Sequence, residues 1–165
     1  MTSASATPTK PRPSLAGLAL TVLAAAALII SLAGATWFAL VGKLDVNFSD
    51  LKGLTSLDSA PTFQHIYFGW LGWALAIVVI VALLVAVVIP VALVARAAQI
   101  VAIVLSLAGA LLTLQAINEL SNQDPGGGFV DHFGWLQLGG YLHVVGWVLA
   151  IIAAVVASRG RARAR

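Results

Sequence analysis

The sequence predicts an all-α integral membrane protein, a four-transmembrane-helix bundle arranged as two tandem helical hairpins that form parallel repeats. Hydrophobic residues make up 61% of the 165 positions and charged residues 9%, whereas soluble domains are about half apolar and about a quarter charged. The apolar residues gather in runs long enough for the ~20 residues that cross a bilayer. A pair of repeated sequence blocks predicts the two hairpins. The chain has no cysteine, which excludes disulfides, thiolate metal sites and thiol catalysis.

The N-terminal part of the chain is predicted to hold a short tail, one span and one loop. Residues 1–14 are rich in Ser, Thr and Pro and are expected to form a disordered cytoplasmic tail. Residues 15–41 contain no charged side chain over 27 positions and form the first predicted span. Residues 42–66 contain three Asp and two Lys, which predicts a loop on the outer side of the membrane.

The middle of the chain is an apolar run that is too long for one span. Residues 66–117 carry a single charged side chain, Arg96, in 52 positions. We expect two spans here, at about 67–92 and 97–117, because about 20 residues suffice for each crossing. Pro90, which breaks a helix, and Arg96 mark the tight turn between them.

The C-terminal part of the chain is predicted to hold a second loop, a fourth span and a tail. Residues 118–135 include Asn, Asp and three consecutive Gly, which predicts a second outer loop. Residues 136–157 are apolar again and form the fourth predicted span. Residues 158–165 are an Arg-rich cytoplasmic tail, so the membrane domain is expected to cover 15–157.

The charged residues are sorted between the predicted loops. Seven of the nine basic residues lie in the two tails and the middle turn, and all six acidic residues lie in the other two loops. Because basic loops stay on the cytoplasmic side, we expect a multi-pass plasma-membrane protein with both termini in the cytoplasm, of a bacterial type.

Two further groups of residues fit this orientation. The aromatic residues expected to form a belt at the outer membrane interface are Trp37, Tyr67, Trp70, Trp73, Trp135 and Tyr141. The basic residues that either bind anionic lipid headgroups or simply fix the topology are Arg159, Arg161, Arg163 and Arg165.

The first apolar run also allows a signal peptide as an alternative. Ala33-Gly34-Ala35 has the small-x-small form of a cleavage site. The run is longer than the usual apolar stretch of about 7–15 residues in such a peptide, and it continues beyond that site. A membrane span is therefore the preferred interpretation.

Two blocks of sequence occur twice in the same order. The five residues Ser-Leu-Ala-Gly-Ala at 31–35 recur at 106–110, with an offset of 75. The pattern Tyr-x4-Gly-Trp-x-Leu-Ala-Ile begins at Tyr67 and recurs from Tyr141, with an offset of 74. Convergence within a restricted alphabet is the alternative explanation, but the matching Tyr and Trp favour a tandem copy of one hairpin.

Small residues spaced four apart line one face of the first helix in each copy. Such faces let helices approach closely, and van der Waals contact then drives their association in lipid. We expect the two faces either to meet each other across the repeat axis or to pack inside their own hairpins. The candidate helix-packing residues are Ala27, Ser31, Ala35, Ala102, Ser106 and Ala110.

Polar side chains in the predicted spans are concentrated in the second copy. Gln115, Asn118 and Glu119 are spaced i, i+3 and i+4 and therefore share one helix face. His143 lies well inside the fourth predicted span. These four residues are the candidate lining of an outward-facing polar vestibule. The alternative is a structural histidine that hydrogen bonds to Gln115 or to a carbonyl, since an imidazole in hydrocarbon needs a partner.

No cofactor is expected, and no catalytic or metal site is assigned. Glu119, Asp131, His132 and His143 are numerous enough to hold a metal, but their spacing matches no ligand pattern. No charged residue lies in the middle of a predicted span, which argues against ion-coupled transport. Nucleotide-binding and common hydrolase motifs do not occur, so the sequence argues against an enzyme.

These observations favour a non-enzymatic accessory or scaffolding subunit of a membrane complex. Its expected partners are the lipid bilayer and either another membrane protein or further copies of the same chain, and nucleic acid is not expected. The alternative is a small transporter or channel that uses the polar vestibule between the third and fourth spans.

Overall fold

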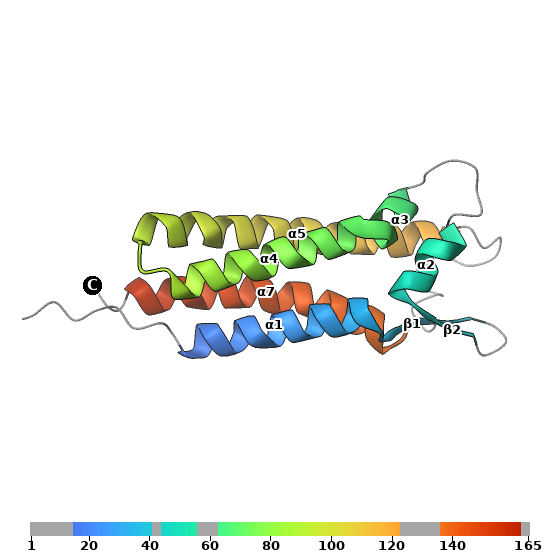
Figure 1. Ribbon diagram of the computed structural model, residues 1–165, viewed down its shortest axis with the longest axis horizontal. Helices are drawn as coiled ribbons and strands as arrows, with labels where there is room; N and C mark the ends of the chain where they lie inside the picture. The colour runs from blue at the N-terminus through green and yellow to red at the C-terminus, as the bar shows by residue number, and fades with distance from the viewer. Residues whose placement is uncertain (1–14, 41–43, 56–62, 123–135, 163–165) are drawn as a thin grey trace, which may run out of the picture.

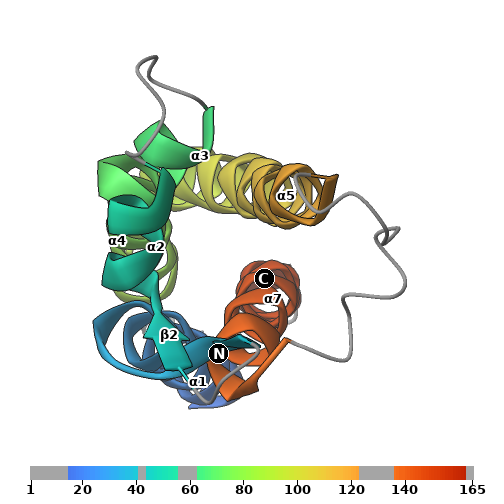
Figure 2. The ribbon, with the colours of Figure 1, turned by 90° about the vertical axis from the view of Figure 1, so that its right-hand side faces the viewer.

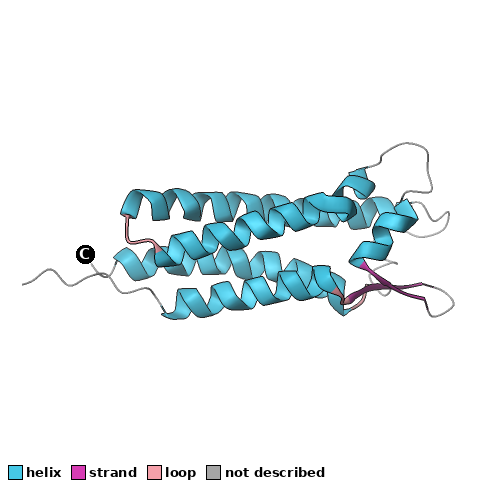
Figure 3. Cartoon of the chain, viewed as in Figure 1, coloured by secondary structure: helices cyan, strands magenta, loops and turns pink. Residues whose placement is uncertain are grey.

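The computed structural model describes residues 15–40, 44–55, 63–122 and 136–162, most of which are helical (Figures 1 and 3). The prediction of four helices long and apolar enough to cross a membrane is confirmed. They are α1 (Leu15–Ala33), a composite helix over Phe63–Val88, α5 (Ala92–Asn122) and α7 (Leu138–Ala162).

The second long helix contains an irregular turn near its start. It consists of α3 (Phe63–Ile66), the π-helical turn η1 (Tyr67–Leu71) and α4 (Gly72–Val88). The Gly72 N–H donates to the Tyr67 carbonyl, five residues earlier, so one extra residue is inserted into the turn. Such π-turns redirect the side chains of a helix and occur frequently at functional sites.

Pro90 produces the turn between the second and third long helices, as the sequence predicts. α4 ends at Val88, and Ile89 is extended, with φ −76° and ψ 125°, because the ring of a following proline disfavours the helical conformation. α5 begins at Ala92. We call this the turn end of the bundle, and the start of α1 and the end of α7 lie at the same end (Figure 1).

The four long helices form a ring in the order α1, α4, α5, α7 (Figure 2). The largest interface joins α1 to α7, the next joins α4 to α5, and the smallest of the four neighbouring interfaces joins α1 to α4. α1 and α5 therefore lie diagonally across the ring. α1 thus packs mainly on α7, and not on α5 or on its hairpin partner α4 as expected, whereas α5 packs on both α4 and its hairpin partner α7.

A small β-hairpin and a short helix cover the other end, which we call the hairpin end. β1 (Thr36–Leu40) pairs antiparallel with β2 (Leu44–Asn47), and α2 (Phe48–Thr55) follows directly. Asn47 caps α2, since its Oδ1 accepts from the N–H groups of Ser49 and Asp50 at 2.9 and 3.0 Å. The Asp50 carboxylate accepts in return from the Asn47 N–H at 3.0 Å, a reciprocal cap of the capping-box kind.

The hairpin corrects the expected extent of the first span. α1 ends at Ala33 rather than at residue 41, and Thr36–Leu40 is a strand. The Ala35 N–H donates to the Ile30 carbonyl at 3.1 Å, which closes the last turn of the helix. The following residues, Thr-Trp-Phe-Ala-Leu, are apolar but rich in types that favour strands. The hairpin is also joined to α7, because the Gln137 N–H donates to the Trp37 carbonyl at 2.7 Å.

Other boundaries also differ from the predicted ones. The expected loop over 42–66 contains β2, α2 and the start of the second long helix. α5 continues to Asn122, beyond the expected end at residue 117, and α7 continues to Ala162, beyond residue 157. The expected tail at 1–14 lies outside the described residues.

The core changes character from one end to the other. Toward the turn end it consists largely of small side chains, which allow close approach of helix backbones; examples are Ala24, Ala82, Ala150, Ala153 and Ala154. Toward the hairpin end it consists of large aromatic side chains, which are Trp37, Phe48, Tyr67, Phe68 and Trp147. Among the buried polar side chains, His143 lies between these aromatic rings, whereas Thr21 lies nearer the turn end.

Candidate functional site

His143 on α7 is the centre of a polar cluster that joins all four long helices. Its side chain is fully buried, with 0% exposed surface. Nδ1 lies 2.7 Å from Oγ of Ser31 on α1, and Nε2 lies 3.0 Å from the hydroxyl oxygen of Tyr67 in η1. The imidazole therefore has a partner on each nitrogen, as a polar ring in an apolar interior requires.

The chain of contacts continues from Tyr67 to α5 and back to α7. The Tyr67 hydroxyl hydrogen bonds to Oγ1 of Thr113 on α5. Thr113 Oγ1 also donates to the Gly109 carbonyl at 2.7 Å and accepts from Nε1 of Trp147 at 3.1 Å. We name Ser31, Tyr67, Thr113, His143 and Trp147 the His143 cluster.

The contacts of Thr113 bear on which nitrogen of the neutral imidazole carries the proton. A hydroxyl group has one proton to donate and two lone pairs. Thr113 donates to Gly109 and accepts from Trp147, so its remaining contact must be a bond donated by Tyr67. Because the Tyr67 proton is then used, the contact between Tyr67 and His143 requires a proton on Nε2. On the Thr113 side of the ring, these bonds favour the Nε2–H tautomer of His143.

Ser31 completes the cluster on the opposite side of the ring. In the Nε2–H tautomer Nδ1 is an acceptor, and Ser31 Oγ donates to it. The same hydroxyl lies 2.8 Å from the Leu28 carbonyl, and a bond donated there would instead require a proton on Nδ1. The Ser31 side therefore favours the opposite tautomer unless its one proton turns from Leu28 to Nδ1. The Ser31 carbonyl in turn accepts from Trp37 Nε1 at 2.7 Å. With the proton on Nε2, each polar side-chain atom of the cluster hydrogen bonds to another atom of the cluster or to a nearby carbonyl.

Aromatic rings surround the imidazole of His143. Ring centroids lie 4.9 Å away for Trp37, 5.4 Å for Trp147, 6.2 Å for Phe48 and 6.4 Å for Tyr67. These distances and the tilted or edge-on orientations are those at which aromatic pairs attract. The hairpin supplies Trp37 and α2 supplies Phe48, so the elements at the hairpin end cover the cluster.

Two glycines make room for this packing. A Cβ on Gly109 would lie 2.7 Å from Trp147 Cζ2, so the absence of a side chain there lets the indole lie against α5. A Cβ on Gly146 would lie 2.8 Å from the side chain of Leu28, which brings α7 close to α1. Both close approaches flank the hydrogen bonds of the cluster.

The structure does not bring together the four residues of the expected vestibule. His143 is buried and bonded to Ser31 and Tyr67, whereas Gln115 and Asn118 are exposed on α5. The expected bond between His143 and Gln115 is therefore replaced by bonds to two hydroxyl groups. The physical reason is helical phase, since the face of α5 that looks inward carries Thr113 and Ala116. The side chain of Glu119 lies outside the described residues.

The expected helix-packing residues lie in the interior or at its edge. Ala27, Ser31, Ala102 and Ser106 are buried, and Ala35 and Ala110 are partly buried. Ser31 has a role beyond packing because it bonds to His143. Its repeat counterpart Ser106 is equally buried, but its Oγ has no hydrogen-bond partner.

Several other candidate residues lie outside the described part of the chain or have side chains of which nothing is described. Asp131 and His132 lie outside the described residues, as do Arg163 and Arg165, and nothing is described of the side chains of Arg159 and Arg161. In the part of the chain that the structure describes, no three His, Asp or Glu residues come together as a metal site would need.

The sequence pattern does not predict most of the residues of the His143 cluster. That pattern places Tyr67 and Trp37 at the membrane interface, but both are fully buried, whereas Trp70 and Tyr141 are exposed. Thr113 does not stand out among the residues of its apolar run. One signal is present in the sequence: Thr113 follows Gly109 by four residues, the spacing at which a threonine hydroxyl bonds to a carbonyl of its own helix.

Comparison with known proteins adds no family: no family model, no curated protein and no solved structure matches this chain.

Proposed function

We propose that this chain is an integral protein of the plasma membrane and an accessory or scaffolding subunit of a membrane complex. Membrane residence is supported by large apolar side chains that are about half exposed on every long helix, for example Val22, Ile77, Val104 and Val148. In water such surfaces drive association. In a bilayer, lipid chains solvate them.

The closed His143 cluster is the observation that supports a structural role. A transport path or an active site needs polar groups that can reach a substrate. The polar groups of this cluster are buried and engaged with one another, and aromatic rings cover them. Because the cluster joins α1, η1, α5 and α7, its natural role is to hold the bundle in one arrangement that a partner can recognise.

The proposed topology has both termini in the cytoplasm. It is supported by the common position of the start of α1 and the end of α7 at the turn end (Figure 1), and by basic residues in both flanking segments. In this orientation the hairpin and α2 lie outside the membrane, and the partner would be another membrane protein or a further copy of the chain.

We also propose that the bundle arose by duplication of one hairpin. Parallel repeats about an axis along the membrane normal place equivalent helices diagonally, and α1 lies diagonally to α5 in the ring. The two largest interfaces, of α1 with α7 and of α5 with α4, are then equivalent. The copies differ at the cluster, since His143 corresponds to Gly69, which leaves Ser106 without the partner that Ser31 has.

Affinity purification tests the accessory role. The full chain, tagged and expressed at its natural level, is extracted in a mild detergent and analysed by mass spectrometry. We expect one membrane protein, or a second copy of the chain, at fixed stoichiometry. His143→Ala, which loosens the bundle, should lower that yield, whereas Tyr141→Ala on the exposed face of α7 should not. A monomer without a constant partner at every detergent concentration would contradict the proposal.

Transport is the second candidate, and the π-turn at Tyr67–Leu71 favours it. An irregular turn beside a buried imidazole is a place where a helix can change shape. A path would run through Tyr67 and His143 and not along Gln115 and Asn118, which lie on the exposed face of α5. Proton flux into liposomes containing the purified chain, abolished in His143→Ala, would favour this function over the accessory role.

A further inference from the structure

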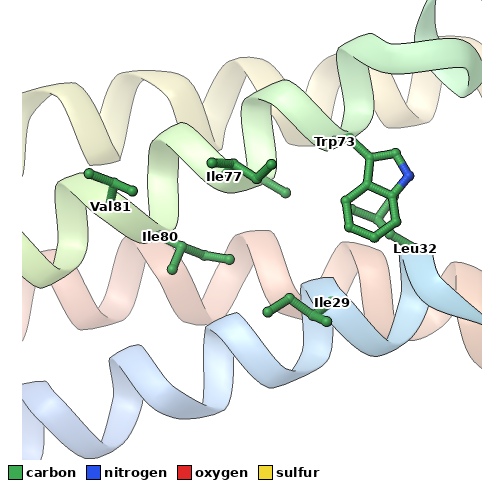
Figure 4. Close-up of a pocket in the computed structure, with 7 residues that line it drawn as sticks. Ile29, Leu32, Trp73, Ile77, Ile80 and Val81 are labelled. Atoms are coloured by element: carbon green, nitrogen blue, oxygen red, sulfur yellow. The ribbon is translucent and has the colours of Figure 1, made fainter.

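An apolar groove follows the seam between α1 and α4 (Figure 4). Its volume is about 240 Å³ and no polar atom lines it. Ile29 and Leu32 line it from α1, and Trp73, Ala76, Ile77, Ile80 and Val81 line it from α4. The seam belongs to the smallest interface between neighbouring helices of the ring, so the groove lies where the bundle is least tightly closed.

The dimensions of the groove define what fits in it. From Trp73 to Val81 the helix rises by about 12 Å, at 1.5 Å per residue. A transmembrane helix is about 10–12 Å wide, too wide for this volume, and the pockets of drug-sized ligands span about 300–1,000 Å³. A single hydrocarbon chain matches both the narrow section and the apolar lining.

The cap at the hairpin end places charged groups above the groove. α2 packs on both α1 and η1 and so lies over the top of the seam (Figure 2). Lys52 on α2 reaches over η1, since its Cε lies 3.9 Å from the position that a Cβ on Gly69 would take. Gly69 is one turn before Trp73, which lines the groove.

Acidic groups accompany Lys52 on the same cap. Asp50 lies two residues away on another side of α2 and Asp45 lies on β2, and both are exposed. A headgroup that carries only negative charge would be repelled by these carboxylates. A headgroup with both a phosphate and an ammonium group carries no net charge, so its phosphate can lie beside Lys52 without net repulsion from the exposed carboxylates of the cap.

We infer that the seam between α1 and α4 is a binding site for one phospholipid with an ammonium-bearing headgroup, its acyl chain in the groove and its phosphate beside Lys52. The inference rests on the proposed membrane residence of the chain, but not on the accessory role. The lipid fills a seam that protein side chains leave open, and so closes the ring on the side of its smallest helix interface.

Native mass spectrometry of the delipidated full chain tests this site. The probes are dioleoyl phosphatidylethanolamine and dioleoyl phosphatidylglycerol, added separately in detergent. We expect one phosphatidylethanolamine per chain to be retained in preference to phosphatidylglycerol. Ile77→Trp, which fills the groove, should weaken retention by about tenfold or more. Lys52→Ala should weaken it by about fivefold, which corresponds to one basic contact with a phosphate.

Val104→Trp is the matched control, because Val104 is as exposed on α5 as Ile77 is on α4 and does not line the groove. Retention in this variant should equal that of the natural chain. Three results would each overturn the site. They are an equal loss of lipid retention in both tryptophan variants, equal retention of the two lipids by the natural chain, and no retained lipid at all. Extraction of the chain from membranes without detergent would instead contradict membrane residence, so the two failures are distinguishable.

Discussion

His143 on α7 and Ser31 on α1 meet through Nδ1 and Oγ at 2.7 Å, at the hairpin end of the largest interface in the bundle. One turn further along α7, Gly146 packs against Leu28 of α1. The Ser31 carbonyl also accepts from Trp37, so this one residue joins the bundle to the hairpin that covers it. Ser31 therefore contacts α7 through its hydroxyl and the hairpin through its carbonyl.

Ser31 and Ser106 provide a matched pair for this hydroxyl contact. Ser31→Ala removes the partner of a buried imidazole nitrogen, and we expect it to lower the free energy of unfolding by about 1–2 kcal/mol. Ser106→Ala removes a buried hydroxyl that lacks a partner, and should be neutral or stabilising. Reversible unfolding in mixed micelles, followed by tryptophan fluorescence, measures both. Equal effects of the two substitutions would show that the bond to His143 contributes little.

His143→Ala should be the most destabilising substitution in the cluster. It leaves Ser31 and Tyr67 without their shared partner and opens a cavity among the aromatic rings, so we expect a loss of about 2–4 kcal/mol. Tyr141→Ala is the control, because this side chain lies on the same helix and is exposed. The same unfolding measurement applies, and a loss for Tyr141→Ala that equals the loss for His143→Ala would contradict the role of the cluster.

The hydrogen-bond geometry also predicts a specific tautomer. We expect neutral His143 to carry its proton on Nε2, because Thr113 has three contacts and only an acceptor left for Tyr67. Ser31 has two contacts and can turn its proton from the Leu28 carbonyl to Nδ1. Nitrogen NMR of the chain labelled at histidine, with His143 assigned by comparison with His143→Gln, distinguishes the two ring nitrogens. A neutral imidazole protonated on Nδ1 would contradict this order of donors and acceptors.

Gly109 and Gly34 occupy equivalent places in the two repeated sequence blocks but have different surroundings. A Cβ on Gly109 would meet the indole of Trp147, whereas a Cβ on Gly34 would have nothing within 4 Å. We expect Gly109→Ala to cost about 1–3 kcal/mol through overpacking and Gly34→Ala to be close to neutral. Thermal unfolding in detergent compares the two variants. If Gly109→Ala unfolds at the temperature of the natural chain, the close contact with Trp147 is not required.

The long helices are predictable from sequence because their signal is local. An uninterrupted apolar run identifies each helix, and the restriction that Pro90 imposes on Ile89 identifies the turn between α4 and α5. The strand at Thr36–Leu40 is not, because an apolar run that continues from a helix does not show by hydrophobicity alone where the helix ends. Its β-branched and aromatic residues are the available indication.

The polar cluster is not predictable for a different reason. His143 is recognisable as a buried polar residue, but its partners come from positions 31 and 67, far away in the sequence. Their identity depends on which helices are neighbours and on how each is rotated. The π-turn at Tyr67 changes that rotation within one helix, so uniform helical spacing does not show that Tyr67 faces the core.

A double-mutant cycle between Ser31→Ala and Tyr67→Phe tests the central claim most directly. The two side chains bond to opposite nitrogens of His143, so they interact through the imidazole. If the cluster holds the four helices as one unit, the losses of unfolding free energy should differ from additivity by about 0.5–2 kcal/mol. Strictly additive losses, within about 0.3 kcal/mol, would contradict the claim that His143 couples these helices.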